Sequence, residues 1–471
     1  MNTAFEELMQ VRGLGAPGES IAFEGRDPVL STRFKLGETA SAVMAAIGVA
    51  VNDLWEARCG RRQSLSIKAT HAAAALRSYN YLHMGSADGG DGQNWALQRA
   101  RQRISTPHRT RDGRYFLPHM GLPHLAERVL GVLGCKYELD DVVAAVAKWD
   151  ALELENAIAE VRACGAMVRT ADEWAAHPHG GVLARKPVIE IIKIADSDPE
   201  PVEHFGDRPL SGVRALDLTR ILAGPTCART LAEHGADVLM VTAPELPQSE
   251  RFVQDTSHGK RTCFLDLNEA DQKDRMIELI RNADIFSQGY RPGVLAARGF
   301  SPQELAELRP GIIYTSMNCY GFDGPFSTRA GWEQLAQSVT GLAAEHGGER
   351  PTLLPAAACD YTTGYLAAYG TLLALGLRAR EGGSWHVRAS LCQSGMFIHR
   401  QERVDYTEQD MEIPPQDLEE ITVSTDTPYG AMRHLGPVLR MSETSPRWDL
   451  PSSPLGSHQP EWLEKSTATR S

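Results

Sequence analysis

Asp360 is the residue with the clearest chemical potential. It stands in the stretch PAAACDYTTG, just before the helical spacing of Tyr361–Arg380. A carboxylate at a helix start is stabilised as an anion by free backbone N–H groups and by the helix dipole. Carboxylates are among the side chains that enzymes use for covalent and acid–base chemistry. The local sequence alone favours a simpler role, in which the side chain only caps the helix.

Three arginines stand where a phosphorylated small molecule could bind. Arg220 follows the apolar run Val213–Leu218, and ligands collect at the carboxyl ends of parallel strands. Arg291 and Arg298 share the segment YRPGVLAARGF. The chain carries 60 acidic against 48 basic residues, a net charge of -12, which argues against a general polyanion-binding surface and against nucleic acid as a partner. Arginines gathered locally could still bind phosphates.

Several cofactor classes are disfavoured by what the sequence lacks. The eight cysteines are scattered, with no CxxC pair and no histidine at zinc-ligand spacing, so we expect neither a metal site nor a disulfide framework. The turn after the first central strand reads AGPT, from Ala223, and not GxGxxG. Nicotinamide and flavin cofactors are therefore not expected.

The N-terminus and the hydropathy favour a soluble, cytoplasmic protein. The first ten residues, MNTAFEELMQ, are acidic and contain no apolar signal region. Val43–Val51 is the longest apolar run of note and falls far short of the roughly 18 residues of a membrane span. We therefore expect no membrane partner.

The elements that must position these residues are clearest in the middle of the chain. Short apolar runs alternate there with stretches of helical spacing, which predicts parallel βαβ units. The expected fold class is α/β, with a doubly wound, Rossmann-like parallel sheet as the large domain and a smaller α+β domain. The strand candidates are Val213–Leu218, Asp237–Val241, Cys263–Leu267, Ile285–Phe286 and Gly311–Ser316, and the helix candidates include Asp271–Asn282 and Pro302–Leu308. Upstream, a turn at Arg111–Arg114 precedes the helix candidates Leu122–Gly134, Glu138–Trp149 and Leu152–Cys164.

One helix-and-strand pattern occurs twice. Tyr361–Arg380 is followed by the strand-like Trp385–Leu391, and Glu38–Arg58 by the extended Ser64–Ala69. A constant offset, from 48 to 370, also pairs Gly60 with Gly382, which indicates a weak internal repeat; two unrelated alanine-rich helices are the alternative. The same offset pairs Asp360 with Glu38. A second nucleophile at Glu38 is conceivable, but an ordinary acid at the start of a helix is the favoured interpretation.

Six segments follow one another in the order and spacing of a known family. They are GVRALDLTRILAGP (212–225), HGADVLMV (234–241), GKRTCFLDL (259–267), YRPGVLAARGF (290–300), PGIIYTSMNCYGFDGP (310–325) and GWEQLAQSVTGL (331–342). With them, residues 212–398 resemble the large domain of the family III CoA-transferases, which include formyl-CoA transferase, carnitine CoA-transferase and the methylacyl-CoA racemases.

The resemblance extends, less strongly, to the rest of the chain and implies four parts. Residues 1–83 resemble a partial repeat of the large-domain helix and strand, and 84–205 the small α+β domain with a linker. Residues 206–400 form the predicted Rossmann-like CoA-binding domain. Residues 401–471 contain a return segment, LGSHQPEWL, and a tail.

The resemblance implies that Asp360 is the nucleophile, forming an aspartyl anhydride and then an aspartyl-CoA thioester. Glu333 is the second expected catalytic carboxylate, either orienting the acyl group or serving as a buried structural acid. Arg220, Ala223, Arg291 and Arg298 are expected to contact CoA, which is a substrate, so no cofactor and no metal are implied. The expected partners are an acyl-CoA and a small carboxylate, in a homodimer. A glycine-rich loop, Gly85–Gly92, is a candidate lid.

Two departures from the family pattern leave alternatives open. The racemases carry a histidine before their acid, whereas this chain has Trp332 before Glu333, which disfavours an acyl-CoA racemase or isomerase. Thr242–Ala243–Pro244 is neutral where the family commonly has charged residues, so a degenerate acyl-CoA-binding protein without turnover is a further alternative.

Overall fold

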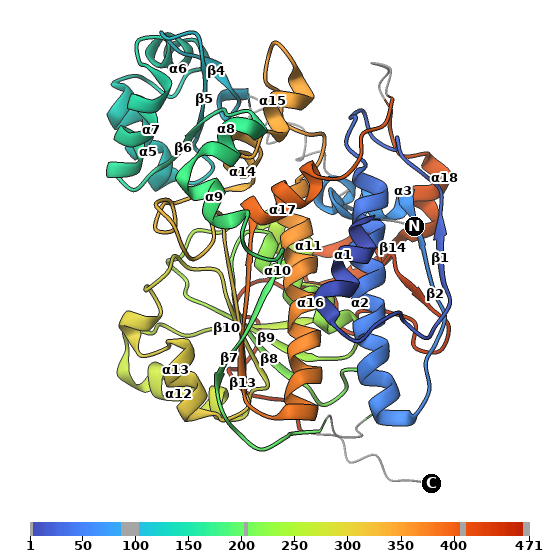
Figure 1. Cartoon of the computed structure of the whole chain (residues 1–471). Helices are drawn as coiled ribbons and strands as arrows, with labels where there is room; N and C mark the ends of the chain where they lie inside the picture. Colours follow the sequence, from blue (N-terminus) through green and yellow to red (C-terminus); the bar gives the residue numbers. More distant parts are fainter. Residues whose placement is uncertain (1–2, 86–102, 202–205, 406–410, 465–471) are drawn as a thin grey trace.

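A computed structural model describes residues 3–85, 103–201, 206–405 and 411–464 of the chain. A seven-stranded sheet of order β10-β9-β8-β11-β12-β13-β7 lies at its centre (Figure 1). The first six strands in this order are parallel, and β7 pairs antiparallel with β13. The strands are β7 (Glu190–Ala195), β8 (Arg214–Leu218), β9 (Asp237–Thr242), β10 (Lys260–Phe264), β11 (Ile285–Gln288), β12 (Ile313–Asn318) and β13 (Ser384–Ser390).

Alternate residues of the central strands face two hydrophobic cores. On β8, Ala215 packs in the core shared with α10 and α16, whereas Leu216 and Leu218 pack in the core shared with α12 and α13. Burial on both faces explains the nearly continuous apolar runs of these strands. The prediction of an α/β fold is confirmed. The four helices are α10 (Ala223–Glu233), α12 (Ala270–Arg281), α13 (Pro302–Leu308) and α16 (Ala358–Glu381).

The N-terminal helix α2 (Leu36–Cys59) packs along α16, and both helices are 24 residues long (Figure 1). Each approaches the strand that follows it at a glycine. A Cβ at Gly48 would lie 2.9 Å from Leu65 of β2 (Leu65–Lys68), and one at Gly370 would lie 2.7 Å from Val387 of β13. These close contacts give a packing reason for glycine at both positions.

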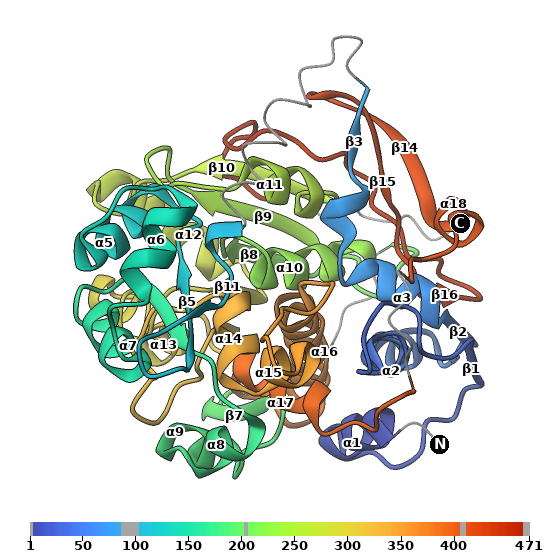
Figure 2. The ribbon, with the colours of Figure 1, turned by 90° about the horizontal axis from the view of Figure 1, so that it is seen from above.

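A small antiparallel sheet, β4-β5-β6, lies beside α14 (Figure 2). The sheet and its helices, residues 103–167, are called the β4–β6 unit below. The predicted helix Leu152–Cys164 is too long: it ends at Glu160, Arg162 turns the chain with φ 55°, and Cys164 begins β6. The elements are β4 (His108–Arg109), β5 (Tyr115–His119), β6 (Cys164–Met167), α5 (Pro123–Leu133), α6 (Leu139–Val146), α7 (Ala151–Glu160) and α14 (Glu333–Val339).

The remaining elements flank these layers. Strands β1-β2-β16 form a small sheet beside α2, and strands β14-β15-β3 form another that packs on η1 (Figure 2). No helix in the described part of the chain combines the length and apolarity needed to cross a membrane. The other elements are α1 (Thr3–Arg12), β1 (Ile21–Glu24), α3 (Ala69–Ala75), η1 (Ser78–Tyr81), β3 (His83–Met84), α8 (Ala171–Ala176), α9 (Pro178–Leu183), α11 (Glu250–Thr256), η2 (Ala296–Arg298), α15 (Leu342–Gly347), α17 (Leu391–His399), α18 (Pro415–Ile421), β14 (Thr422–Thr427), β15 (Gly430–Leu435) and β16 (Arg440–Met441).

Candidate active site

A cavity of about 540 Å³ opens between the β4–β6 unit and the first turns of α14 and α16. Its size lies within the range of roughly 300–1,000 Å³ that is common for small-molecule sites. The fold brings to it residues that are far apart in sequence: Tyr79 of η1, His119 of β5, Phe252 of α11, Glu333 and Asp360. The two predicted catalytic carboxylates therefore line one cavity.

Asp360 is the third residue of α16, in its first turn, and is 8% exposed. The sequence predicts this residue just before the helix; the helix instead begins at Ala358. The second turn of α16 packs closely on α10, since a Cβ at Gly364 would lie 2.4 Å from the carbonyl oxygen of Ala223. This contact fixes where the Asp360 backbone sits relative to the large sheet.

The Glu333 carboxylate caps α16. It accepts the backbone N–H of Cys359 at 3.1 Å on one oxygen and that of Asp360 at 2.5 Å on the other. The Gln337 side chain also donates to Glu333, and its own oxygen accepts the N–H of Leu354 at 2.7 Å. Glu333 thus takes the backbone donors that were expected to stabilise Asp360.

The electrostatics of Asp360 correct the sequence-based expectation. Burial, followed by the charge of Glu333, raises the pKa of Asp360 well above its usual range. Burial also raises the pKa of Glu333 to about 7, although the hydrogen bonds it accepts act in the opposite direction. The expectation that the helix start would hold Asp360 as a stabilised anion is wrong, because those N–H groups are bonded to Glu333.

The start of α2 has the same arrangement as the start of α16. The Asp27 carboxylate accepts the backbone N–H of Gly37 at 3.2 Å and that of Glu38 at 2.7 Å. Glu38 is the third residue of α2, an acid in the first turn of the helix, and its carboxylate lies 3.8 Å from Lys35 Nζ. The 540 Å³ cavity does not include Glu38 among its lining residues.

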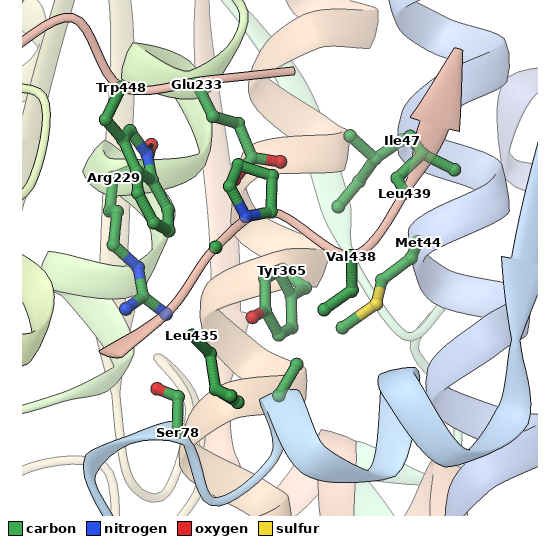
Figure 3. A pocket seen from close by; sticks show the side chains of 13 residues that line it. Met44, Ile47, Ser78, Arg229, Glu233, Tyr365, Leu435, Val438, Leu439 and Trp448 are labelled. Atoms are coloured by element: carbon green, nitrogen blue, oxygen red, sulfur yellow. Dashed lines mark hydrogen bonds between the residues drawn. The ribbon is translucent and has the colours of Figure 1, made fainter. Parts of the chain in front are cut away.

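A buried network holds the residue after Asp360. Asp255 of α11 accepts the hydroxyl of Ser78 at 2.6 Å and that of Tyr361 at 3.1 Å, and pairs with Arg229 at 3.1 Å. Arg229 stacks over Trp448, 5.3 Å from the ring centre, at a second, small cavity (Figure 3). The network therefore ties η1, α10, α11 and α16 together behind the site.

A histidine and a tryptophan form one wall of the 540 Å³ cavity. The rings of His119 and Trp332 stack with centres 4.5 Å apart and planes at 26°. Burial lowers the pKa of His119 to about 4, so its imidazole is neutral at pH 7. Sequence reasoning did not single out His119; its position at the end of a strand after the turn at Arg111–Arg114 was the available signal.

The turn that carries Arg220 is fixed by a buried ion pair. Lys260 Nζ lies 2.8 Å from Asp217, both side chains being fully buried, and also donates to the carbonyl of Pro225 at 2.8 Å. The predicted turn Ala223–Pro225 forms the first residues of α10, because proline is tolerated in the first turn of a helix. Ala223 packs against α16, and its neighbour Leu222 lines the 540 Å³ cavity.

The predicted arginines lie near two further basic residues of α5. The pKa of His124 is lowered by burial and then by the charges of Arg128, Arg220 and Arg291, so these groups act on one another. Arg298 is exposed. Burial raises the pKa of Tyr290, and the charges of Arg220 and Arg298 partly oppose that rise, which places both arginines near this tyrosine. His124 and Arg128 were missed from sequence because nothing in it indicates that α5 lies near Arg220 and Arg291.

The structure describes little of the candidate lid, and it shows one acidic cluster that the sequence did not predict. Residues 86–92 of the candidate lid Gly85–Gly92 lie outside the described residues. His71, Asp417 and Glu420 have ligand atoms within 4.8 Å of one another, but Lys68 Nζ lies 2.6 Å from Asp417. The ammonium group balances this acidic cluster, which we interpret as an ion-pair network.

Comparison with known proteins places the chain in a family. The model of CoA-transferase family III matches residues 210–433. Acetyl-coenzyme A transferase nodX of Hypoxylon pulicicidum is 31% identical over 429 residues, which cover 81% of this chain and 72% of that protein. An acyl-CoA transferase of Gibberella moniliformis is 29% identical over 396 residues, covering 70% and 69%. A CAIB/BAIF family protein from Brucella suis is a solved structure with 27% identity and a TM-score of 0.39, covering 41% and 56%. The chain belongs to CoA-transferase family III and is an enzyme of that family.

Proposed function

We propose that this enzyme moves CoA from an acyl-CoA donor to a carboxylate acceptor with Asp360 as the covalent nucleophile. The Asp360 carboxylate attacks the thioester, expels CoA thiolate and forms a mixed anhydride. The thiolate attacks the aspartyl carbonyl, which releases the donor acid and leaves an aspartyl-CoA thioester. The acceptor carboxylate displaces CoA to form a second anhydride, and the thiolate attacks its acyl carbonyl, giving the new acyl-CoA and free Asp360.

The observation that carries this proposal is the position of Asp360 on the wall of the 540 Å³ cavity, with its backbone fixed by Glu333. A fixed nucleophile reduces the entropy lost on reaching the transition state. We assign Glu333 a positioning role, because both of its oxygens are bonded to the first turn of α16.

The basic residues around α5 are proposed to bind the CoA phosphates. Arg220, Arg291 and Arg298 are the predicted contacts, and Arg128 adds a guanidinium nearby. The lowered pKa of His124 favours its neutral imidazole, which can still donate one hydrogen bond. Guanidinium groups suit phosphates because they donate two hydrogen bonds in a plane. Ala223 is proposed to contact CoA as well, since it is the first residue of α10 and follows Arg220 closely in the chain.

The finer description of the fold is part of the same proposal. Helices packed on both faces of the sheet support a doubly wound, Rossmann-like large domain. The β4–β6 unit would be the smaller α+β domain. A cytoplasmic location and a homodimer are also proposed.

A racemase or isomerase is not favoured. Proton exchange next to the thioester carbonyl needs a group that titrates near neutral pH. Glu333 has a pKa of about 7, but both of its oxygens are bonded to backbone N–H groups of α16. His119 reaches this cavity, but burial lowers its pKa to about 4, and Trp332 occupies the position of the racemase histidine.

A pair of variants tests the proposal. Asp360→Ala is expected to lower the rate of acyl-CoA-dependent CoA transfer by at least about 1,000-fold, because the covalent path is lost. Glu38→Gln is the matched control, since it changes the equivalent acid of α2 and should leave the rate within about twofold. A rate in Asp360→Ala equal to that of the control would refute the proposal.

A further inference from the structure

The cavity in front of Asp360 is walled mainly by hydrocarbon. The α5 side contributes Met120, Leu122, Ala126 and Leu130, and the opposite side contributes one apolar or aromatic residue from each of five other segments. These are Tyr79, Leu222, Phe252, Trp332 and Ala357. Such a lining favours apolar over charged ligands by the area removed from water.

The charged side chains of the described lining are already engaged or lie at the rim. Arg251 supplies the one guanidinium among these residues, and it donates to the backbone carbonyls of Tyr79 at 2.8 Å and Leu82 at 2.9 Å. Glu127 is exposed, whereas Glu333 and Asp360 are buried acids. A second carboxylate on the acyl group would therefore enter beside two buried acids, and burying an unpaired charge near like charges is unfavourable.

We infer that the acyl group and the acceptor acid are both monocarboxylic, with an uncharged, apolar body. Each of the two anhydrides on Asp360 places one of these bodies in the same cavity, so one lining selects both. This inference rests on the proposed function and names its substrate class.

Three thioesters test the inference on the unmodified enzyme. Octanoyl-CoA and octanedioyl-CoA have the same chain length and differ by one terminal carboxylate, and acetyl-CoA lacks the apolar body. Covalent labelling of Asp360 is measured with each by hydroxylamine trapping. We expect the second-order rate constant of labelling with octanoyl-CoA to exceed that with octanedioyl-CoA by on the order of 100-fold. It should also exceed the rate constant with acetyl-CoA.

The outcomes separate this inference from the proposed function. Labelling that is strongest with octanedioyl-CoA, or that occurs with acetyl-CoA alone, overturns the inference and leaves Asp360 as the nucleophile. Labelling by none of the three overturns the proposed function and the inference together.

A variant pair tests the wall itself. Leu130→Arg on α5 places a cation in the cavity and should reduce the preference for octanoyl-CoA over octanedioyl-CoA by at least about tenfold. Val143→Arg on α6 is the matched control, because Val143 is 39% exposed and does not line the cavity. An unchanged preference in a folded Leu130→Arg enzyme would overturn the inference. If this variant does not fold, the comparison of the three thioesters on the unmodified enzyme still tests the inference.

Discussion

Asp360 and Glu333 are 27 residues apart in sequence and meet at one hydrogen bond, from the Asp360 backbone to the Glu333 carboxylate. Both side chains are buried, and the pKa of each is raised. Two neighbouring acids in such a place titrate as a pair, and the charge of one opposes ionisation of the other.

This coupling predicts the pH dependence of the covalent step. Labelling of Asp360 by acyl-CoA should fall as the pH falls through a midpoint well above 4, because the reactive form is the anion and its pKa is raised by burial and by Glu333. Glu333→Gln removes the neighbouring charge and should lower that midpoint. A loss of activity with an unchanged midpoint would show that Glu333 serves only the structure of α16.

The sequence could single out Asp360 and Glu333 as candidates, because each lies in a segment that resembles the family, and the structure brings both to one cavity. It could not give their electrostatics. The local sequence suggested free N–H groups at the start of α16, but the donors that act there are bonded to a carboxylate from α14, and this long-range contact leaves no mark in the sequence near Asp360.

At the scale of elements, the close packing of α10 and α16 sets the position of Asp360. Gly364→Ala would place a Cβ 2.4 Å from the carbonyl oxygen of Ala223, a backbone atom that cannot move independently. We expect a loss of about 1–3 kcal/mol in the free energy of unfolding, together with a lower rate of CoA transfer. Denaturant titration measures the first and the transfer assay the second.

The control for this change lies on the same helix. A Cβ at Gly376 would meet only the far end of the Arg380 side chain, at 3.2 Å, so Gly376→Ala should be tolerated and could stabilise α16 by up to about 1 kcal/mol. Equal effects of the two substitutions would contradict a specific role for the α10–α16 contact.

The elements themselves were largely accessible from sequence. The central strands have buried, nearly continuous apolar runs, and four of the predicted runs coincide with β8, β9, β11 and β12. The predicted run Cys263–Leu267 is shifted along the chain and shares only Cys263 and Phe264 with β10. The end of α7 could not be predicted from sequence. The helix stops before Arg162, which has a left-handed backbone conformation, although the sequence continues with helical spacing. The nearness of α5 to Arg220 and Arg291 could not be predicted either, since such a long-range approach leaves no pattern in the sequence of α5.

At the scale of the whole molecule, the site is assembled from parts of one chain that are distant in sequence. Tyr79 comes from the N-terminal segment, His119 from the β4–β6 unit, and Glu333 and Asp360 from the helices on the large sheet. The net charge of -12 describes the overall balance, while basic residues of α5 and of the large-sheet loops gather locally. The whole-chain charge therefore does not oppose a phosphate-bearing substrate.

The most direct test of the account is to trap the covalent intermediate. The enzyme is incubated with octanoyl-CoA and then hydroxylamine, and the peptide that contains Asp360 is sequenced by mass spectrometry. We predict a hydroxamate on Asp360 that requires acyl-CoA and is absent from Asp360→Ala. A hydroxamate on another residue, or transfer activity with no modified peptide, would contradict the account.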